Sequence, residues 1–239
     1  MDTGNRRKDE LLATLSHELR NPLASLRSSL YVLQRAEPGG GQAKRMMAIM
    51  ARQVDQLTSL SNDLLDAARI GLDKIALHRS TTDLCALVRS AVEDNQGLFD
   101  GNALRLVVEV PDEPMPIFAD AGRLAQMLGD LLHNAAKFTP AGGEVTLIVE
   151  RGPTSDLGRI SIRDTGAGIA PDLLPHVFEP FIQGDQSLAH TQGGLGLGLA
   201  LVKGLAELHG GCVRAASDGP GHGATFTIDL PLWRGEGEP

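Results

Sequence analysis

Two long helical patterns, separated by a cluster of helix-breaking residues, constrain how the first third of the chain can fold. The first runs from about residue 6 to 36, the second from about 42 to 72, and the segment "AEPGGG" (36–41) interrupts them. Each pattern gathers its apolar residues on one helical face. Two such helices form an antiparallel hairpin, which cannot bury both apolar faces alone. The pattern therefore predicts a hairpin that dimerises into a four-helix bundle.

One histidine on the first predicted helix lies away from the apolar face. In the stretch "LATLSHELRNPLASL" (12–26), the leucines repeat at helical spacing, whereas His17 projects to the opposite side and Glu18 follows it. Asn21 lies one turn further along on the side of His17. A neutral histidine is a competent nucleophile, and a neighbouring carboxylate can accept or orient its ring proton. A solvated surface histidine is the alternative interpretation of this stretch alone.

From about residue 77 the pattern changes to short strands mixed with helices. It predicts strands over 104–110, 144–150, 159–166, 211–217 and 223–230, and helices over 83–95, 122–138 and about 195–209. The order lacks a strict βαβ repeat, which favours an α+β sandwich with helices on one face of a mixed sheet. We expect two domains: a helical hairpin over 1–75 and the sandwich over 76–235.

Charge and composition exclude several classes of function. The formal net charge of −8 argues against a nucleic acid or an anionic membrane as a partner bound by bulk electrostatics. Apolar runs are too short to cross a bilayer, and the N-terminus does not resemble a signal peptide. The two cysteines and seven histidines show no spacing typical of a structural zinc site.

Three glycine clusters follow or separate the predicted strands: "DTGAGI" (164–169), "GGLGLGL" (193–199) and "GHGATF" (221–226). Glycine permits the close backbone approach that a loop needs to surround a nucleotide. The second cluster leads into a predicted helix, whose N-terminal amides can meet phosphates. It lacks the lysine of a P-loop. For each cluster taken alone, an ordinary structural turn is the favoured interpretation, because glycine turns are common.

The predicted helix over 122–138 adds polar chemistry to these loops. With its leucines set toward the core, Asp130, Asn134 and Lys137 fall together on one flank. Oxygen ligands beside a lysine can hold Mg²⁺ and phosphate oxygens. A solvated helix flank is the alternative for these three residues in isolation.

Six segments together resemble the catalytic core of bacterial sensor histidine kinases, in the order and at the spacing of that family. They are "SHELRNPL", "NAAKFTP", "DTGAGI", "FEPF", "GGLGLGLAL" and "GHGATF". The resemblance covers essentially the whole chain. It implies a dimerisation and histidine-phosphotransfer hairpin followed by an ATP-binding domain of the GHKL or Bergerat type, shared with gyrase, Hsp90 and MutL. It also implies a bacterial cytoplasmic location, either of this chain or of a larger sensor protein that contains it.

The resemblance implies roles for the residues of the hairpin and of the helix over 122–138. His17 would be the phospho-acceptor, Glu18 its neighbouring proton acceptor, and Asn21 a residue for dephosphorylating the receiver. Asn134 would bind Mg²⁺ and Lys137 would contact a phosphate. The family usually has asparagine where this chain has Asp130, which we expect to be a second Mg²⁺ ligand.

The glycine clusters take their roles from the same resemblance. Asp164 would accept the adenine amino group, supported by the hydroxyl of Thr225, while Gly166 and Gly168 would shape the pocket. Phe178 and Phe181 would anchor a lid over about 182–194. The nucleotide-contacting hinge of this lid would comprise Gly194, Gly196, Leu197 and Gly198.

The implied activity is ATP-dependent autophosphorylation on His17, followed by phosphoryl transfer to an aspartate of a response-regulator receiver. ATP and Mg²⁺ would be required, the protein would be a homodimer, and receiver phosphatase activity is expected as a second function. Two alternatives stay open. One is a GHKL-type Mg²⁺-ATPase that forms no phosphohistidine, and the other is a dimeric scaffold that binds nucleotide without catalysis.

Overall fold

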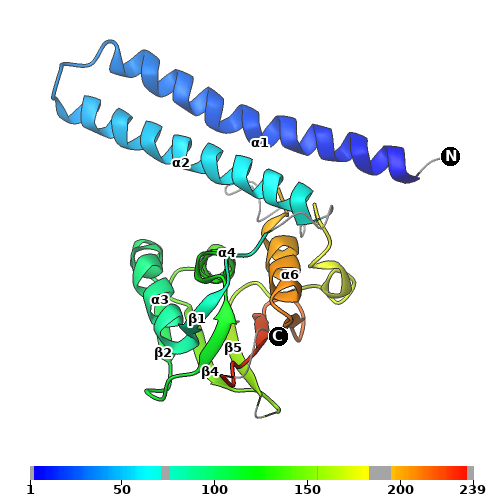
Figure 1. The fold of residues 1–239 in the computed structure, drawn as a ribbon. Helices are drawn as coiled ribbons and strands as arrows, with labels where there is room; N and C mark the ends of the chain where they lie inside the picture. The colour runs from blue at the N-terminus through cyan, green and yellow to red at the C-terminus, as the bar shows by residue number, and fades with distance from the viewer. Residues whose placement is uncertain (1–2, 71–75, 155, 183–194, 236–239) are drawn as a thin grey trace.

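The computed structural model describes residues 3–70, 76–154, 156–182 and 195–235. Its N-terminal part is an antiparallel pair of helices, α1 (Thr3–Leu33) and α2 (Gly41–Ile70), drawn in blue and cyan in Figure 1. The break between them falls on the glycine-rich segment, as predicted. Helix α1 continues through Pro22, whose ring is buried. The predicted hairpin is confirmed; the expected end of its domain at residue 75 lies outside the described residues.

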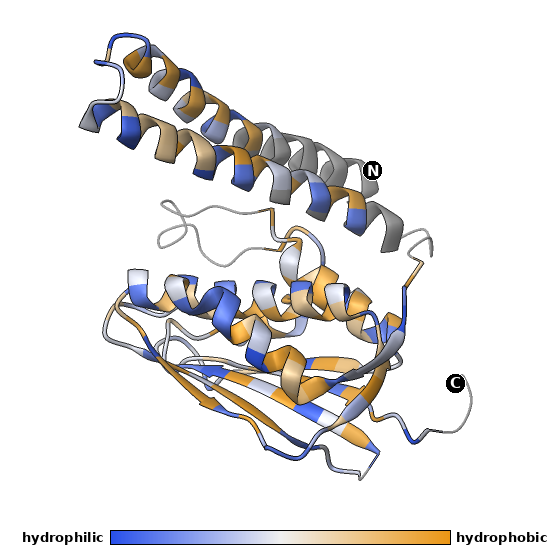
Figure 2. Ribbon diagram, turned by 60° about the vertical axis from the view of Figure 1, so that its left-hand side comes forward, coloured by the Kyte–Doolittle hydropathy of each residue, from blue (hydrophilic) through white to orange (hydrophobic). Residues whose placement is uncertain are grey.

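The hairpin leaves much of its apolar surface in contact with solvent. Ser29 and Ala43 are buried where the helices meet. By contrast, Leu23 is 54% exposed and Tyr31 58% exposed on α1, and Val54 is 51% exposed on α2. Figure 2 shows hydrophobic residues distributed along both helices. A single hairpin therefore cannot cover its own apolar residues.

The second part contains a five-stranded mixed sheet covered by helices on one face. The strand order is β2 (Arg105–Glu109), β4 (Glu144–Arg151), β5 (Leu157–Asp164), β7 (Thr225–Pro231) and β6 (Cys212–Ala216). Strands β2 and β4 are parallel and the other pairs antiparallel. Helices α3 (Leu84–Gly101), α4 (Ala121–Phe138) and α6 (Gly198–Leu208) lie on one side (Figure 2). This confirms the predicted sandwich.

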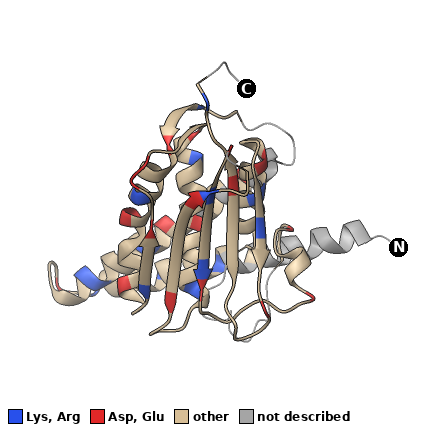
Figure 3. Ribbon diagram, turned by 90° about the horizontal axis from the view of Figure 1, so that it is seen from below, with Lys and Arg blue, Asp and Glu red and all other residues tan. Residues whose placement is uncertain are grey.

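The core of the second part lies between the sheet and its helices. Alternate residues of the central strands point into it, and their burial alternates accordingly along β4 and β5. The largest fully buried side chains of this core include Phe99, Leu128, Leu131, Leu147 and Ile162. The opposite face of the sheet carries several charged residues (Figure 3).

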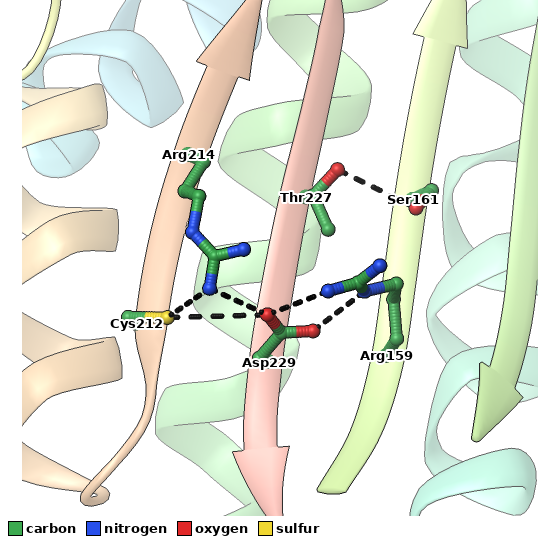
Figure 4. A network of polar contacts seen from close by, with 6 residues as sticks. All are labelled: Arg159, Ser161, Cys212, Arg214, Thr227 and Asp229. Carbon is green, nitrogen blue, oxygen red and sulfur yellow. Dashed lines mark hydrogen bonds and ion pairs between the residues drawn. The ribbon is translucent and has the colours of Figure 1, made fainter. Parts of the chain in front are cut away.

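A polar network on the open face of the sheet joins three neighbouring strands (Figure 4). Asp229 of β7 is 2% exposed and accepts from Arg159 Nε at 2.7 Å and Arg159 Nη2 at 3.0 Å. Arg214 of β6 donates to the same carboxylate at 3.0 Å and to Cys212 Sγ at 3.2 Å. The arginines hold the pKa of Asp229 below its ordinary value.

Some elements were not predicted from the sequence. The short strands β1 (Ser80–Asp83) and β3 (Pro116–Ala119) pair with each other outside the main sheet. A short 3₁₀ helix spans Leu174–His176. Helix α3 also extends to Gly101, beyond the predicted end at residue 95. None of the helices in the described residues is long and apolar enough to cross a membrane.

Candidate functional site

Helix α4 carries the polar flank that the sequence predicted. Leu124, Leu128, Leu131 and Ala135 are buried, whereas Asp130, Asn134 and Lys137 are each partly exposed. Asp120 caps the helix by accepting from the Arg123 amide at 3.1 Å, which fixes its first turn. A Cβ atom added to Gly198 would lie 3.9 Å from Asp130 Cγ. Asp130 therefore lies beside the N-terminus of α6, where backbone amides favour anions.

Asp164 is a buried carboxylate held by backbone amides at the end of β5. It is 5% exposed, and its Oδ1 accepts from the Gly166 amide at 2.8 Å and from the Ala224 amide at 3.3 Å. No hydrogen bond within the described ranges uses Oδ2. Burial raises the pKa of Asp164, while the two amide hydrogen bonds lower it. The geometry suits a carboxylate that offers its second oxygen to a donor on a ligand.

The loop after Asp164 fits tightly against neighbouring backbone. A Cβ on Gly166 would lie 2.4 Å from the Phe138 carbonyl oxygen. Gly168 has φ +70°, and a Cβ there would lie 2.1 Å from the carbonyl oxygen of Gly219. These positions require glycine because a side chain would collide with main-chain atoms. Both predicted pocket glycines thus bring the loop against the C-terminal end of α4 and the loop before β7.

Asp164 is held by a main-chain donor that the sequence did not predict, while the role predicted for the Thr225 hydroxyl stays a prediction. Within the described residues, no hydrogen bond joins Thr225 to Asp164; Thr225 pairs with Arg163 across β5 and β7. The supporting donor is the backbone amide of Ala224. The sequence does not indicate this role of Ala224, because any residue except proline can donate a hydrogen bond from its backbone amide.

The two ends of the predicted lid are joined by a backbone hydrogen bond. The Phe181 amide donates to the Gly196 carbonyl at 2.9 Å, and Phe181 has φ +68°. Phe178 packs edge-to-face on Phe226, with the ring centroids 6.3 Å apart. The lid residues 183–194, including Gly194, lie outside the described residues.

Leu197 and Gly198 lie at the start of α6. The Leu197 side chain is buried with Leu195 and Leu201, so only its backbone could reach a nucleotide. Gly198 is the first residue of the helix. These residues and the α4 flank therefore meet at the N-terminus of α6.

The residues predicted for phosphoryl transfer lie on the other part of the chain. His17 and Glu18 belong to α1, but their side chains lie outside the described residues. Asn21 is exposed on the same helix. The part of the chain that the structure describes contains no group of three or more His, Cys, Asp or Glu side chains that could hold a metal ion.

Comparison with known families matches each part separately. Residues 7–72 match the family described as "His Kinase A (phospho-acceptor) domain". Residues 119–234 match the family described as "Histidine kinase-, DNA gyrase B-, and HSP90-like ATPase".

Similar proteins contain both parts in the same order. The chain is 36% identical over 94% of its length to hybrid signal transduction histidine kinase D of Dictyostelium discoideum, and 36% identical over 97% to the non-motile and phage-resistance protein of Caulobacter vibrioides. It spans only 15% and 28% of the length of these two relatives.

Solved structures agree with this fold. Full-length ShkA in complex with AMPPNP is 35% identical to the chain, with a TM-score of 0.69 over 93% of this chain and 46% of that one. The histidine kinase AdeS of Acinetobacter baumannii shares the fold at 24% identity, with a TM-score of 0.67 over 90% of this chain and 98% of that one. The chain therefore belongs to the histidine kinases and carries both the phospho-acceptor domain and the ATP-binding domain of that family.

Proposed function

We propose that the chain phosphorylates itself on His17 with ATP and then passes the phosphoryl group to an aspartate of a response-regulator receiver domain. The observation that carries this proposal is the buried Asp164 carboxylate. Two backbone amides hold one of its oxygens, and the domain it belongs to follows a phospho-acceptor hairpin in the same chain. An adenine amino group is a donor that suits the second oxygen. This combination favours a histidine kinase over an ATPase that lacks a phospho-acceptor.

The transfer needs a nucleophile on α1 and a phosphate site on the second domain. Neutral His17 would attack the γ-phosphorus, with Glu18 accepting or orienting the ring proton, and ADP would leave. Asn134 and Asp130 supply the oxygen atoms that a hard cation prefers, so Mg²⁺ would bind here together with the ATP phosphates. When bound, Mg²⁺ would neutralise charge on the transferring phosphate. Lys137 would contact a phosphate oxygen from the same flank of α4.

Dimerisation is part of this proposal. The exposed apolar residues of the hairpin, including Leu23, Leu30, Val54 and Leu65, provide the surface for a second copy. The resulting four-helix bundle would present His17 and Asn21 to a receiver. Asn21 lies one turn from His17 and is exposed, which suits a role in orienting water for receiver dephosphorylation.

Incubation with γ-labelled ATP tests the proposal. We expect an acid-labile, base-stable label on the wild-type protein and none on His17→Ala, while nucleotide affinity stays unchanged because the pocket lies on the other domain. Release of free phosphate without protein label would support the ATPase alternative. Nucleotide binding with neither product would support the scaffold.

A further inference from the structure

A serine hydroxyl links the two glycine-rich loops that border the buried Asp164 carboxylate. Ser217 follows strand β6, and its Oγ accepts from the Ile169 amide at 2.9 Å. The same hydroxyl donates to the Gly223 carbonyl at 2.7 Å. Ile169 lies in the loop after Asp164, and Gly223 lies in the loop before β7. One side chain therefore holds both loops.

The hydrogen bonds of this hydroxyl occupy each of its bonding positions. A hydroxyl offers one proton and two lone pairs. The Gly219 amide donates to Ser217 Oγ at 3.3 Å, in addition to the bond from Ile169. The Gly219 carbonyl lies 3.4 Å from Oγ, so the Gly223 carbonyl at 2.7 Å is the better acceptor for the single proton. The direction of the O–H bond is therefore set by its neighbours.

The bond from Ser217 to Gly223 also acts on Asp164. The Gly223 carbonyl and the Ala224 amide belong to one planar peptide group. The carbonyl of this group accepts from Ser217 at 2.7 Å, while its N–H donates to Asp164 Oδ1 at 3.3 Å. A hydrogen bond at the carbonyl end fixes the plane and polarises the N–H at the other end. Ser217 thus acts on the carboxylate through a single peptide group.

Main-chain bonds hold this segment on both sides of that peptide group. The Gly223 amide donates to the Gly166 carbonyl at 3.1 Å, and the Asp164 amide donates to the Ala224 carbonyl at 2.9 Å. Neither bond uses the peptide group between residues 223 and 224. Gly223 has φ +70°, and a Cβ there would lie 2.0 Å from the Asp164 carbonyl oxygen, so no side chain can restrain this position. Loss of the Ser217 hydroxyl would therefore free the peptide plane while the loop stays in place.

We propose that Ser217 is a positioning residue that determines selectivity for the adenine amino group. It fixes the peptide group that donates to Asp164 Oδ1, and because a carboxylate is planar, the direction of Oδ2 is fixed with it. The inference rests on the proposed function, in which Oδ2 accepts from that amino group. A buried acceptor of fixed direction discriminates strongly against a ligand that lacks the matching donor.

Paired calorimetric titrations of the whole chain test this role. The two ligands are ATP and purine riboside triphosphate, which lacks the exocyclic amino group. We expect the wild type to bind ATP about tenfold more tightly than the analogue, because the analogue leaves Asp164 without a donor. For Ser217→Ala, the affinity for ATP should fall about fivefold and that for the analogue less than about twofold, so that the preference for ATP narrows.

Two further variants separate the hydroxyl from its surroundings. Ser217→Thr keeps the hydroxyl and should keep the preference for ATP; a threonine variant that behaves like Ser217→Ala would count against the proposal. Ser161→Ala is the matched control. It removes a partly buried hydroxyl from the open face of the sheet, 3.5 Å from Thr227 Oγ1, and should leave both affinities unchanged.

The titrations also distinguish positioning from a general effect on folding. An unchanged preference for ATP in Ser217→Ala would overturn the proposal. An equal loss of both affinities would overturn it as well, because Ser217 would then support the pocket as a whole. A wild type without a preference for ATP would refute the adenine role of Asp164 and the role of Ser217 with it. Absence of phosphohistidine would refute the kinase function alone, since the titrations measure binding and not transfer.

Discussion

Asp164 and Ala224 are joined by a 3.3 Å hydrogen bond from a backbone amide to a side-chain oxygen, across the ends of β5 and β7. The same oxygen accepts from Gly166, so the orientation of the carboxylate is set by main-chain atoms alone. Such an arrangement survives changes of neighbouring side chains, and it leaves the second oxygen to a ligand. The raised pKa of Asp164 means that burial of this charge costs free energy in the unliganded protein.

Asp164→Asn should weaken ATP binding while leaving the unliganded domain folded. The asparagine oxygen can keep the amide hydrogen bonds, but its NH₂ group would then oppose the adenine amino group. We expect affinity to fall about tenfold or more, since an unsatisfied buried donor costs about 1–3 kcal/mol. The free energy of unfolding without nucleotide should stay the same or rise. Calorimetric titration and denaturant unfolding measure the two quantities, and an unchanged affinity would count against the adenine site.

Asp130→Asn should shift the Mg²⁺ dependence of autophosphorylation to higher concentrations. The carboxylate lies beside the start of α6 and one turn from Asn134, where it can attract the cation directly or through water. The amide keeps an oxygen ligand but loses the charge. A Mg²⁺ titration of the phosphorylation rate measures the shift, with exposed Asp172→Asn as the control. Superimposable titrations would show that the negative charge of Asp130 has no effect on Mg²⁺ binding.

Gly168→Ala should unfold the pocket loop, whereas Gly129→Ala in α4 should be harmless. Gly168 has φ +70°, and its added Cβ would lie 2.1 Å from a carbonyl oxygen. A Cβ on Gly129 meets nothing within 4 Å and stands in a helix, where alanine is favoured by about 0.5–1 kcal/mol. We expect nucleotide affinity to be lost in the first variant and thermal stability to increase slightly in the second. Equal behaviour of the two variants would contradict the tight fit of the loop.

The long periodic elements could be predicted from the sequence. Helices α1, α2 and α4 carry apolar residues at helical spacing over many turns, and β4 and β5 are rich in apolar and β-branched residues that partly alternate with polar ones, so local patterns were sufficient. Strands β1 and β3 have only four residues each, and β1 consists of "STTD". A strand of that length is defined by its partner, which local sequence does not reveal.

The features of the candidate site also fall into two groups: those that residue type indicates and those that depend on contacts distant in the sequence. Residue types alone predict the roles proposed for Asp164, Asn134 and the glycines after Asp164, because a carboxylate, an amide and glycine suit the proposed chemistry. The support from Ala224 and the contact of Ser217 with Ile169 depend on pairs that are 60 and 48 positions apart. Neither spacing leaves a local signal, so only the folded chain could reveal them.

Asp229→Asn should destabilise the fold without affecting nucleotide affinity. The side chain is 3% exposed between Arg159 and Arg214, and the loss of its charge leaves two guanidinium groups facing each other. We expect a loss of about 2 kcal/mol in the free energy of unfolding, since both arginines keep access to water.

The pH dependence of this contribution has a definite sign. Because the pKa of Asp229 is lowered on folding, its stabilisation is present above the ordinary value of 3.8 and is lost as the pH falls through the lower folded value. Denaturant unfolding at neutral and acidic pH measures both effects. If the wild type and the variant differ equally at neutral and at strongly acidic pH, the charge does not provide the stabilisation.

His209 should make the second domain sensitive to mild acid. It is 6% exposed at the end of α6; Nδ1 hydrogen-bonds to the Leu205 carbonyl at 2.7 Å, and Nε2 accepts from the Asp120 amide at 3.1 Å. The second bond requires an unprotonated Nε2, and burial lowers the pKa of His209. The nearby charges of Arg79 and Asp120 act in opposite directions on it. Protonation would place one N–H against another at the junction of α4 and α6.

The folded protein therefore binds fewer protons at His209 than the unfolded chain does. Stability from this residue is complete above the ordinary pKa of 6.5 and decreases as the pH falls below it, until the folded value is passed. His209→Gln cannot titrate, so between about pH 7.5 and 5.5 it should lose less unfolding free energy than the wild type does. Exposed His222→Gln is the control and should follow the wild-type curve. Parallel curves for His209→Gln and the wild type would show that protonation of His209 does not disturb the fold.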